Sequence, residues 1–442
     1  MSDQHAARPE TVDAVIIGAG PAGSTAAATL AMAGRSVLVL ERRRFPRFHI
    51  GESMLPYTMG LLEHLNLLDH AKTQGFPPKL GAEFIFPTGD YRRVVFADQG
   101  PGRHAETFQV ERSRFDTMLA DHARACGAQV IDDAFVQDLV LDGERVTGVR
   151  YSAGGRTRTV TAPYVIDAGG RSSKIAQAFR LRRPIDRLRM VAVYRHYTGL
   201  DERYNPGYEG DIQVGGHPDG WLWAIPIRPD TISVGAVTPK SVMRDRRPED
   251  VFDDHLSRVE RITTRLTGTT PMYDDLRVEA DYCYYADTLA GPGWFLAGDS
   301  GAFIDPIFSA GVCLAMTTAF RAARTVDQIL SQPARAEELQ SEYQNFYKTG
   351  YDTNARLVEA YYESEYNLGR YLRINMGVDV RSDEAGKWFT RLLSGDFWTK
   401  ENAIAELLRK EERWDTFAPF ERAFGCPIYA EADEAASALA AS

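Results

Sequence analysis

The sequence predicts an α/β fold in three parts, and three observations support this prediction. A short β-branched run at residues 12–17 leads into a glycine-rich turn and then into a helix of small residues. Strand-like segments follow in mid-chain at 190–197, 221–227 and 231–237, and after Pro333 the composition becomes helical. Strand, glycine-rich turn and helix in this order are typical of a Rossmann-like domain. We therefore expect such a domain, a second β-sheet and a C-terminal helical region.

Composition limits the classes of protein to which the chain can belong. Its 442 residues suit two or three packed subdomains better than one small core. The hydrophobic fraction of 44% and the charged fraction of 25% are ordinary for a globular protein. No apolar run approaches the ~18 residues of a membrane span. With 51 Lys and Arg against 61 Asp and Glu, the net charge of −10 disfavours nucleic acids and anionic membranes as partners.

Cysteine spacing and the N-terminus indicate the expected compartment. The four cysteines show no Cys-x-x-Cys pattern and no zinc-like spacing with histidine; they are Cys126, Cys283, Cys313 and Cys426. Residues 1–12 lack the basic and apolar regions of a signal peptide, so we expect a loose tail there. The sequence predicts a cytoplasmic protein with reduced thiols and no metal site.

The glycine-rich turn carries the pattern Gly-x-Gly-x-x-Gly, at Gly18, Gly20 and Gly23. Gly18 permits the turn, Gly20 lets a pyrophosphate approach the backbone, and Gly23 lets the helix pack close to the strand. The phosphates would lie at the helix N-terminus. Residues 36–40 form a second apolar strand, which ends in Glu41, 23 residues after Gly18. This spacing suits a carboxylate that binds ribose hydroxyls, so we predict dinucleotide binding.

Three later segments favour FAD over NAD. Residues 293–300 run into Asp299 and resemble the second flavin motif of flavoproteins, in which the aspartate hydrogen-bonds the ribityl chain. Residues 164–171 resemble the intermediate motif of flavin hydroxylases, and residues 110–116 resemble a helix start whose arginine, here Arg112, contacts the cofactor. The resemblance implies an FAD-binding domain of the flavin monooxygenase, hydroxybenzoate hydroxylase-like, type.

Residues 221–226 read Trp-Leu-Trp-Ala-Ile-Pro. Trp221 and Trp223 would lie on one face of a strand, a pattern that also suits a half-buried core strand ended by proline. Trp-x-Trp-x-Ile-Pro, in a chain with an N-terminal Gly-x-Gly-x-x-Gly, resembles the flavin-dependent halogenases. In that family the two tryptophans lie beside the flavin and hinder direct oxygenation of an organic substrate. The resemblance implies the same role for Trp221 and Trp223.

The same resemblance implies a catalytic lysine. In the family a lysine steers hypohalous acid to the substrate, and the matching segment, residues 75–84, contains Lys79. By residue type alone, Lys79 would be an exposed lysine at a strand edge. Its register after residues 51–53, which match the family's flavin-contact loop, favours the catalytic role. Lys72 lies in a helical stretch and does not match.

Residues 303–311 contain Phe-x-x-Pro-x-x-Ser-x-Gly, a second signature of the family, and lead into an expected helix at 312–324. Backbone N–H groups at a helix start can form an anion pocket. The resemblance implies a halide, chloride or bromide, near the amides of Ala310 and Gly311. It also implies a catalytic role for Ser309.

Position 308 indicates which branch of the family the chain resembles. The tryptophan-specific branch has glutamate immediately before the signature serine, whereas this chain has Phe308. A carboxylate there is proposed to help activate the electrophile or to stabilise the cationic ring intermediate. Its absence favours the branch that halogenates phenols or pyrroles, some of them as thioesters on carrier proteins.

The predicted site comprises two sets of residues. Those expected to bind the cofactor are Gly18, Gly20, Ala22, Gly23, Glu41, Arg42, Gly51, Glu52, Ser53, Arg112, Asp299, Pro306 and Gly311. Those expected to act in catalysis are Lys79, Trp221, Trp223 and Ser309.

The motifs divide the chain into a discontinuous FAD-binding domain, a substrate-side sheet and a helical region. We assign residues 11–80, 108–185 and 276–330 to the first, and residues 81–107 and 186–275 to the second. Residues 335–442 form the helical region expected to cover the substrate pocket. Its crowded tyrosines and phenylalanine, between Tyr343 and Tyr366, suit a core, and in the resembled branch such helices also line the pocket.

The sequence therefore predicts an FAD-dependent halogenase that uses reduced FAD, O2 and chloride or bromide on a phenolic or pyrrolic ring in natural-product biosynthesis. No second Gly-x-Gly-x-x-Gly occurs, which fits reduced FAD arriving from a separate flavin reductase. The substrate would be a small molecule, free or on a carrier protein. Three alternatives remain: a flavin-dependent hydroxylase or epoxidase, a geranylgeranyl-reductase-like enzyme, and a flavin-binding protein without turnover.

Overall fold

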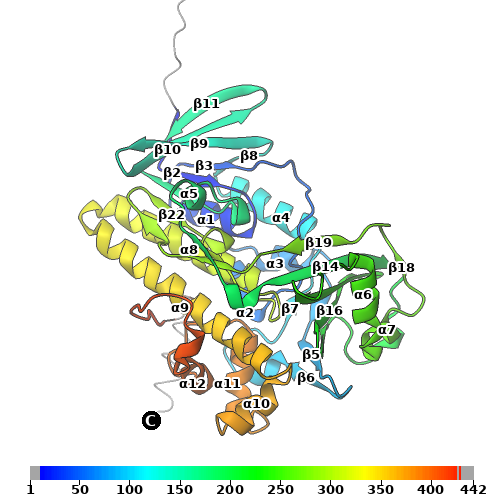
Figure 1. Ribbon diagram of the computed structural model, residues 1–442. Helices are drawn as coiled ribbons and strands as arrows, with labels where there is room; N and C mark the ends of the chain where they lie inside the picture. The colour runs from blue at the N-terminus through cyan, green and yellow to red at the C-terminus, as the bar shows by residue number, and fades with distance from the viewer. Residues whose placement is uncertain (1–9, 426–427, 430–442) are drawn as a thin grey trace, which may run out of the picture.

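The computed structural model describes residues 10–425 and 428–429, which form two large sheets flanked by helices (Figure 1). Residues 1–9 of the predicted loose tail lie outside the described part of the chain. Residues 10–12 of that tail are described. Strand β1 (Glu10–Thr11) pairs in parallel with β11 (Arg156–Thr161), so the tail prediction is wrong for these two residues. Cys426 also lies outside the described residues.

The first large sheet is the predicted Rossmann-like sheet. Its strand order is β21 (Ala290–Gly291), β22 (Trp294–Leu296), β12 (Tyr164–Asp167), β2 (Ala14–Ile17), β3 (Val37–Leu40) and β8 (Gln129–Ile131). All neighbours pair in parallel except the edge strand β21. Every residue of β2 and β3 is buried, as expected for parallel strands covered on both faces.

Helices cover this sheet. The helices that pack on one another here are α1 (Pro21–Met32), α4 (Arg112–Ala125) and α8 (Ala310–Ser331). The remaining short helices of the first half are α2 (Pro56–His64), α3 (Leu68–Lys72) and α5 (Lys174–Ala178).

Glycines allow helix α1 to approach strand β2 closely. Gly18 has φ of +91°, in the left-handed region that glycine adopts without strain. A Cβ on Gly23 would lie 1.8 Å from the carbonyl oxygen of Gly18, so only glycine fits there. A Cβ on Gly20 would meet only an Arg47 guanidinium nitrogen, at 3.3 Å, and the backbone there is open to a ligand.

The second large sheet lies beside the first (Figure 1). Its strand order is β18 (Thr270–Pro271), β14 (Met190–Thr198), β17 (Thr231–Pro239), β16 (Gly220–Arg228), β15 (Ile212–His217), β5 (Gly81–Ile85) and β6 (Tyr91–Val95). β19 (Arg277–Ala280) pairs with β14 and so belongs to the second sheet. The sequence analysis assigned these residues to the FAD-binding domain, and the boundary predicted at residue 276 is therefore too early. Helices α6 (Pro248–Ser257) and α7 (Glu260–Arg265) accompany the sheet.

Smaller sheets complete the β-structure. β1 and β11 continue into β10 (Arg145–Ala153) and β9 (Ala134–Asp142), the four-stranded sheet at the top of Figure 1. A three-stranded sheet joins β13 (Arg182–Pro184), β20 (Tyr284–Ala286) and β23 (Ala302–Phe303). β4 (Pro78–Lys79) pairs with β7 (Thr107–Phe108).

The C-terminal region is helical, as predicted. Its helices are α9 (Ala336–Glu363), α10 (Leu368–Asn375), α11 (Asp383–Leu393) and α12 (Ala403–Arg409). The long helix α9, yellow in Figure 1, runs past the Rossmann-like sheet and ends beside the second one. Tyr347 and Tyr351 stack within α9, with ring centroids 4.5 Å apart. Within residues 10–425, no helix is both long and apolar enough to cross a membrane.

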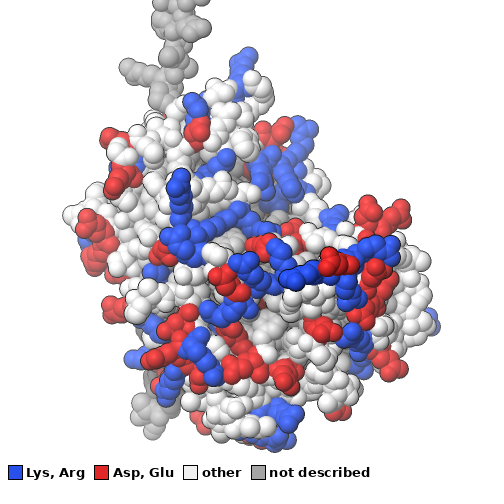
Figure 2. Space-filling view, in the orientation of Figure 1, with Lys and Arg blue, Asp and Glu red and all other residues white. Residues whose placement is uncertain are grey.

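Charges are mixed over the surface despite the acidic balance of the chain. Figure 2 shows acidic side chains scattered over this face and basic side chains gathered in a band across its middle. The net charge of −10 therefore conceals local regions of positive potential.

We expect Gly23→Ala to lower the free energy of unfolding by about 1–3 kcal/mol, because helix α1 must move away from the Gly18 carbonyl to admit the methyl group. Urea denaturation of the FAD-free protein measures this loss. Gly20→Ala is the matched control, since its methyl group meets only the end of a flexible side chain. Equal losses in both variants would contradict the close packing of α1.

Candidate active site

The first part of the site is the turn between β2 and α1. Glu41, at the end of β3, accepts hydrogen bonds from the backbone N–H of Ala19 at 2.9 Å and of Arg43 at 3.0 Å. Its carboxylate is buried beside the glycine turn. Helix α1 begins at Pro21 without a side-chain cap. Its first N–H groups are thus left for an anionic ligand.

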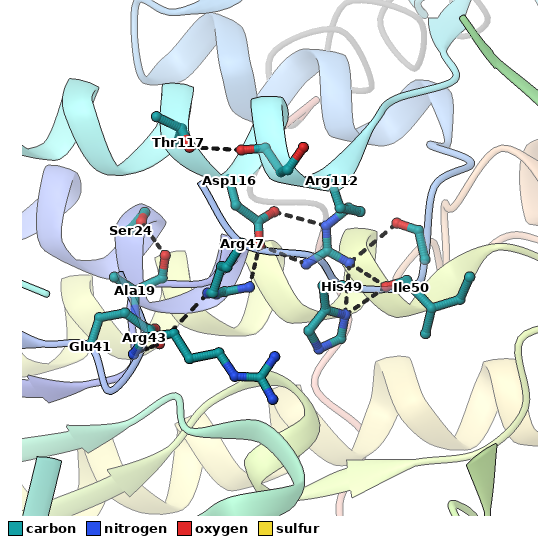
Figure 3. Close-up of polar contacts among 12 residues, drawn as sticks. Ala19, Ser24, Glu41, Arg43, Arg47, His49, Ile50, Arg112, Asp116 and Thr117 are labelled. Atoms are coloured by element: carbon teal, nitrogen blue, oxygen red, sulfur yellow. Dashed lines mark hydrogen bonds and ion pairs between the residues drawn. The ribbon is translucent and has the colours of Figure 1, made fainter. Parts of the chain in front are cut away.

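Two arginines share one carboxylate beside this turn (Figure 3). Asp116 accepts from Arg112 at 2.8 and 3.0 Å and from Arg47 at 3.0 Å. Arg47 Nε also lies 3.6 Å from Glu41 and makes no hydrogen bond to the described residues. One guanidinium nitrogen of Arg47 therefore lies close to the Gly20 backbone, where the phosphates of a dinucleotide would bind. Sequence analysis did not identify Arg47, which belongs to none of the motifs, and it singled out the segment of Asp116 only for Arg112.

Residues 51–53 form the loop next to these arginines. Gly51 has φ of +98°, and Arg112 donates to the Ile50 carbonyl at 2.6 Å and to the Gly51 carbonyl at 3.2 Å. The buried Glu52 lies 2.9 Å from His196 Nε2. Its other carboxylate oxygen has no hydrogen-bond partner among the described residues. A buried acceptor of this kind is costly unless a ligand completes it.

Asp299 lies at the start of the turn after β22, where Gly298 has φ of +56°. Burial raises the pKa of the Asp299 carboxyl to about 6. This carboxyl, the open turn at Gly20, the uncapped helix and the incomplete Glu52 together fit a dinucleotide carrying hydroxyls and a pyrophosphate. Arg42 is the exception among the predicted contacts, since it is exposed and donates to Ser172 at 2.9 Å.

Lys79 is buried, with 1% of its surface exposed, so it is not the exposed strand-edge lysine that residue type alone would suggest. Its Nζ donates to the Ser53 hydroxyl and to the Met54 carbonyl, both at 2.9 Å. Burial lowers the pKa of the ammonium from 10.5 to about 7, and the charge of Asp211 opposes this without cancelling it. The structure thus brings Lys79 onto the loop that contains the predicted cofactor contacts Glu52 and Ser53.

Trp221 and Trp223 lie on the same face of β16, as alternation along a strand requires, with ring centroids 5.9 Å apart. Both are buried. Trp223 donates to Ser233 at 3.2 Å. A Cβ on Gly235 of the neighbouring strand β17 would lie 2.2 Å from the Trp223 ring, so glycine makes room for this indole.

A chain of hydrogen bonds ties Trp221 to the loop before α8. Trp221 Nε1 donates to the Tyr362 hydroxyl at 3.0 Å, and Tyr362 donates to Asp305 at 3.0 Å. The other oxygen of Asp305 accepts from the Ile307 N–H at 3.0 Å. Burial raises the pKa of the Asp305 carboxyl to about 7. Sequence analysis identified neither Asp305 nor Tyr362, although both lie inside segments that it singled out.

The loop at 303–311 ends in a strained residue. Ser309 has φ of +56°, which is uncommon for a residue other than glycine, and precedes helix α8 without capping it through its side chain. Ala310 and Gly311 are the first two residues of α8, which begins two residues before the start predicted at residue 312, and their N–H groups therefore lie at the helix N-terminus. A Cβ on Gly311 would meet only the Phe303 ring, at 3.4 Å.

A cavity of about 280 Å³ opens beside this loop. Phe308 lines it together with Phe84 and Tyr361, whose ring centroids lie 6.3 and 5.6 Å from the Phe308 ring. Tyr366 and Phe389 add further aromatic walls. The tyrosines of helix α9 and of the segment after it are therefore divided. Tyr343, Tyr347 and Tyr351 are buried in the core, whereas Tyr361 and Tyr366 line the cavity.

The family described as "FAD binding domain" matches residues 11–346 of the chain. The chain is 34% identical over 362 residues to a "Tryptophan 2-halogenase" of Chondromyces crocatus, covering 80% of this chain and 68% of that protein. It is 32% identical to "Flavin-dependent halogenase armH1" of Armillaria mellea, with coverage of 85% and 73%. It is 31% identical to a "1H-pyrrole-2-carbonyl-[peptidyl-carrier protein] brominase" of Pseudoalteromonas luteoviolacea, with coverage of 73% and 78%.

Solved structures show the same likeness. The flavin-dependent brominase Bmp2 superposes with a TM-score of 0.81 at 28% identity, covering 90% of this chain and 97% of that one. The myxobacterial chondrochloren halogenase CndH superposes with a TM-score of 0.76 at 30% identity, covering 97% of both chains.

We expect Tyr362→Phe to destabilise the protein by about 1–3 kcal/mol, because the buried Trp221 N–H loses its acceptor and Asp305 loses a donor. Urea denaturation measures the change. Tyr282→Phe is the matched control, since the buried Tyr282 hydroxyl has no hydrogen-bond partner among the described residues. An unchanged stability of Tyr362→Phe would show that the chain of bonds is not formed.

The buried amine of Lys79 also predicts a pH dependence. Its pKa is about 7 in the folded protein and 10.5 when exposed, so between these values the unfolded state binds more protons and stability rises with pH. We expect Lys79→Met to be more stable than the wild type near pH 7, by an amount on the order of a few kcal/mol that shrinks toward pH ~10. Denaturation curves across this range measure the difference. Lys72→Met, at an exposed position, should show no such trend. If the difference in stability between Lys79→Met and the wild type stayed constant with pH, the amine of Lys79 would not be buried.

Proposed function

This chain belongs to the flavin-dependent halogenases, and we propose that its Lys79 delivers the halogen to a phenolic or pyrrolic ring held in the cavity beside Phe308. The chain is an enzyme that uses reduced FAD, O2 and chloride or bromide to halogenate an aromatic substrate in natural-product biosynthesis. The observation that carries our proposal is the buried amine of Lys79, bonded to the flavin-contact loop.

FAD would be held by the turn from Gly18 to Gly23, by Glu41 at the ribose and by Arg112 and Asp299. To these we add Arg47 at the pyrophosphate, because its guanidinium lies close to the Gly20 backbone. When bound, reduced FAD together with O2 supplies the two-electron oxidation that turns halide into an electrophilic halogen species.

Lys79 suits the delivery of hypohalous acid. With a pKa near 7, the buried amine is present in both protonation states at neutral pH. The ammonium can donate to the oxygen of hypohalous acid, whereas the free amine can accept the halogen at nitrogen and release hydroxide. Its bonds to Ser53 and Met54 hold the nitrogen at one place, so the direction of delivery is set by the protein.

Trp221 and Trp223 would keep the organic substrate away from the flavin. Both indoles are fixed by hydrogen bonds, to Tyr362 and to Ser233. A rigid apolar wall excludes a substrate ring, while a small oxidant can pass around it. The halide would rest on the N–H groups of Ala310 and Gly311 at the start of α8.

The cavity supports an electron-rich ring as substrate. Phe308 replaces the glutamate of the tryptophan-specific branch, so this position offers no carboxylate to a cationic ring intermediate. Phenols and pyrroles need less such help. Likeness to the pyrrole-carrier brominase supports a substrate tethered to a carrier protein. We further propose that a separate flavin reductase supplies reduced FAD and that the enzyme is cytoplasmic.

The test is a product assay with the full chain, FAD, a flavin reductase, NADH, O2 and either chloride or bromide. Free and carrier-bound phenols and pyrroles are offered, and products are analysed by mass spectrometry. We expect a halogen isotope pattern with the wild type and its loss, by at least about 100-fold, in Lys79→Ala.

Lys72→Ala is the control, since Lys72 is exposed on α3, and it should retain the wild-type rate. Oxygen insertion that depends on neither halide nor Lys79 would place the chain with the hydroxylases or epoxidases. Reduction of an isoprenoid double bond, measured in a separate assay, would favour a geranylgeranyl-reductase-like enzyme.

A further inference from the structure

The mouth of the cavity differs in chemistry from its inner wall. The inner wall is aromatic, whereas the mouth carries arginines on α10, on β6 and in the turn before α11; they are Arg92, Arg370, Arg373 and Arg381. We propose that the cavity takes an aromatic ring that carries an anionic group, a carboxylate or a phosphate, and that these arginines bind the anion. This inference rests on the proposed function, because it concerns the substrate of the same site.

Most of the positive charge at the mouth is unbalanced. Arg381 pairs with Asp379, the one carboxylate among the described residues that line the cavity. Its single negative charge also acts on Arg92 and Arg373. Arg92, Arg370 and Arg373 form no ion pair with any residue that the structure describes. Arg370 and Arg373 are exposed one helical turn apart on α10, so they project from neighbouring positions on its surface.

Arg92 is held close to this charge from the opposite side. It is half-buried on β6 and donates to the Val380 carbonyl at 3.1 Å, which fixes it beside Arg381. Burial lowers the pKa of the Arg92 guanidinium; the charge of Asp379 opposes this, and the charge of Arg381 adds a smaller lowering. A partly desolvated cation beside a second cation is stabilised when an anion joins them.

The size of the cavity limits what enters it. At about 280 Å³ it falls just below the ~300–1,000 Å³ typical of pockets for larger ligands, so it suits a single ring with a short substituent. The anionic group must therefore lie at the mouth. Two sources fit this chemistry: a carboxylate on the ring itself, or the phosphate of a phosphopantetheine arm that emerges from the cavity.

Calorimetric titration of the FAD-loaded full chain with matched probes tests this inference without requiring turnover. One pair is 4-hydroxybenzoate and its neutral isostere 4-hydroxybenzamide; the other is 4-hydroxybenzoyl phosphopantetheine and its counterpart without the phosphate. We expect the anionic member of at least one pair to bind about 10-fold tighter, as hydrogen bonds to charged groups allow. The pair that shows the preference identifies the source of the anion.

The double variant Arg370→Glu/Arg373→Glu should abolish this preference and leave binding of the neutral probes unchanged. Arg156→Glu/Arg158→Glu is the matched control, because it makes the same charge change at two exposed positions of β11. Equal binding within both pairs, no binding of any probe, or a preference that survives in the α10 variant would overturn the proposal.

The outcome for the halogenation reaction is separate. Incorporation of halogen into a neutral phenol by the wild type, without any anion preference, would retain the proposed function and reject the role of the arginines. An anion preference without halogenation of any substrate would retain the role of the arginines and reject the proposed function.

Discussion

The hydrogen-bond chain from Trp221 through Tyr362 to Asp305 joins the three parts of the fold at one point. Trp221 belongs to the second sheet, Tyr362 to the long helix α9, and Asp305 to the loop that precedes α8 of the flavin domain. Each bond contributes only about 1 kcal/mol on its own. Because Trp221 and Asp305 are buried, breaking one bond leaves a buried polar atom without its partner, which costs more than the bond itself. This chain of hydrogen bonds ties together the strand that carries both tryptophans, helix α9 and the loop before α8.

Buried charge is the second constraint on the site. Arg47 and Arg112 share Asp116, while Lys79 is buried and, among the described residues, no carboxylate contacts its ammonium. A fold selected only for stability would avoid such groups, since burying an ion costs several kcal/mol unless it is well paired. Their burial makes sense where a ligand brings complementary groups. For Lys79, burial also brings its pKa close to neutrality, where an amine can exchange protons.

Phe308 sets the character of the cavity wall beside the loop at 303–311. It places an aromatic ring there, and Phe84 and Tyr361 pack around it. A carboxyl does remain in this loop, at Asp305, but it is bonded to Tyr362 and Ile307 and lines no part of the cavity. The inner wall is therefore apolar, and recognition of a charged substrate passes to the arginines at the mouth.

The amino-acid sequence by itself determined the parts of the site whose geometry is local. The glycine turn, Glu41 at the end of its strand and the adjacent indoles of β16 follow from a few consecutive residues, because strand alternation and turn conformation act over short distances. Only the tertiary structure decided the burial of Lys79 and the pairing of Tyr362 with Trp221, which are 141 residues apart in the chain. The positions of Arg47 and of the arginines at the cavity mouth were likewise decided only by the tertiary structure. Such contacts depend on how sheets and helices pack, and no spacing rule along the chain specifies that packing.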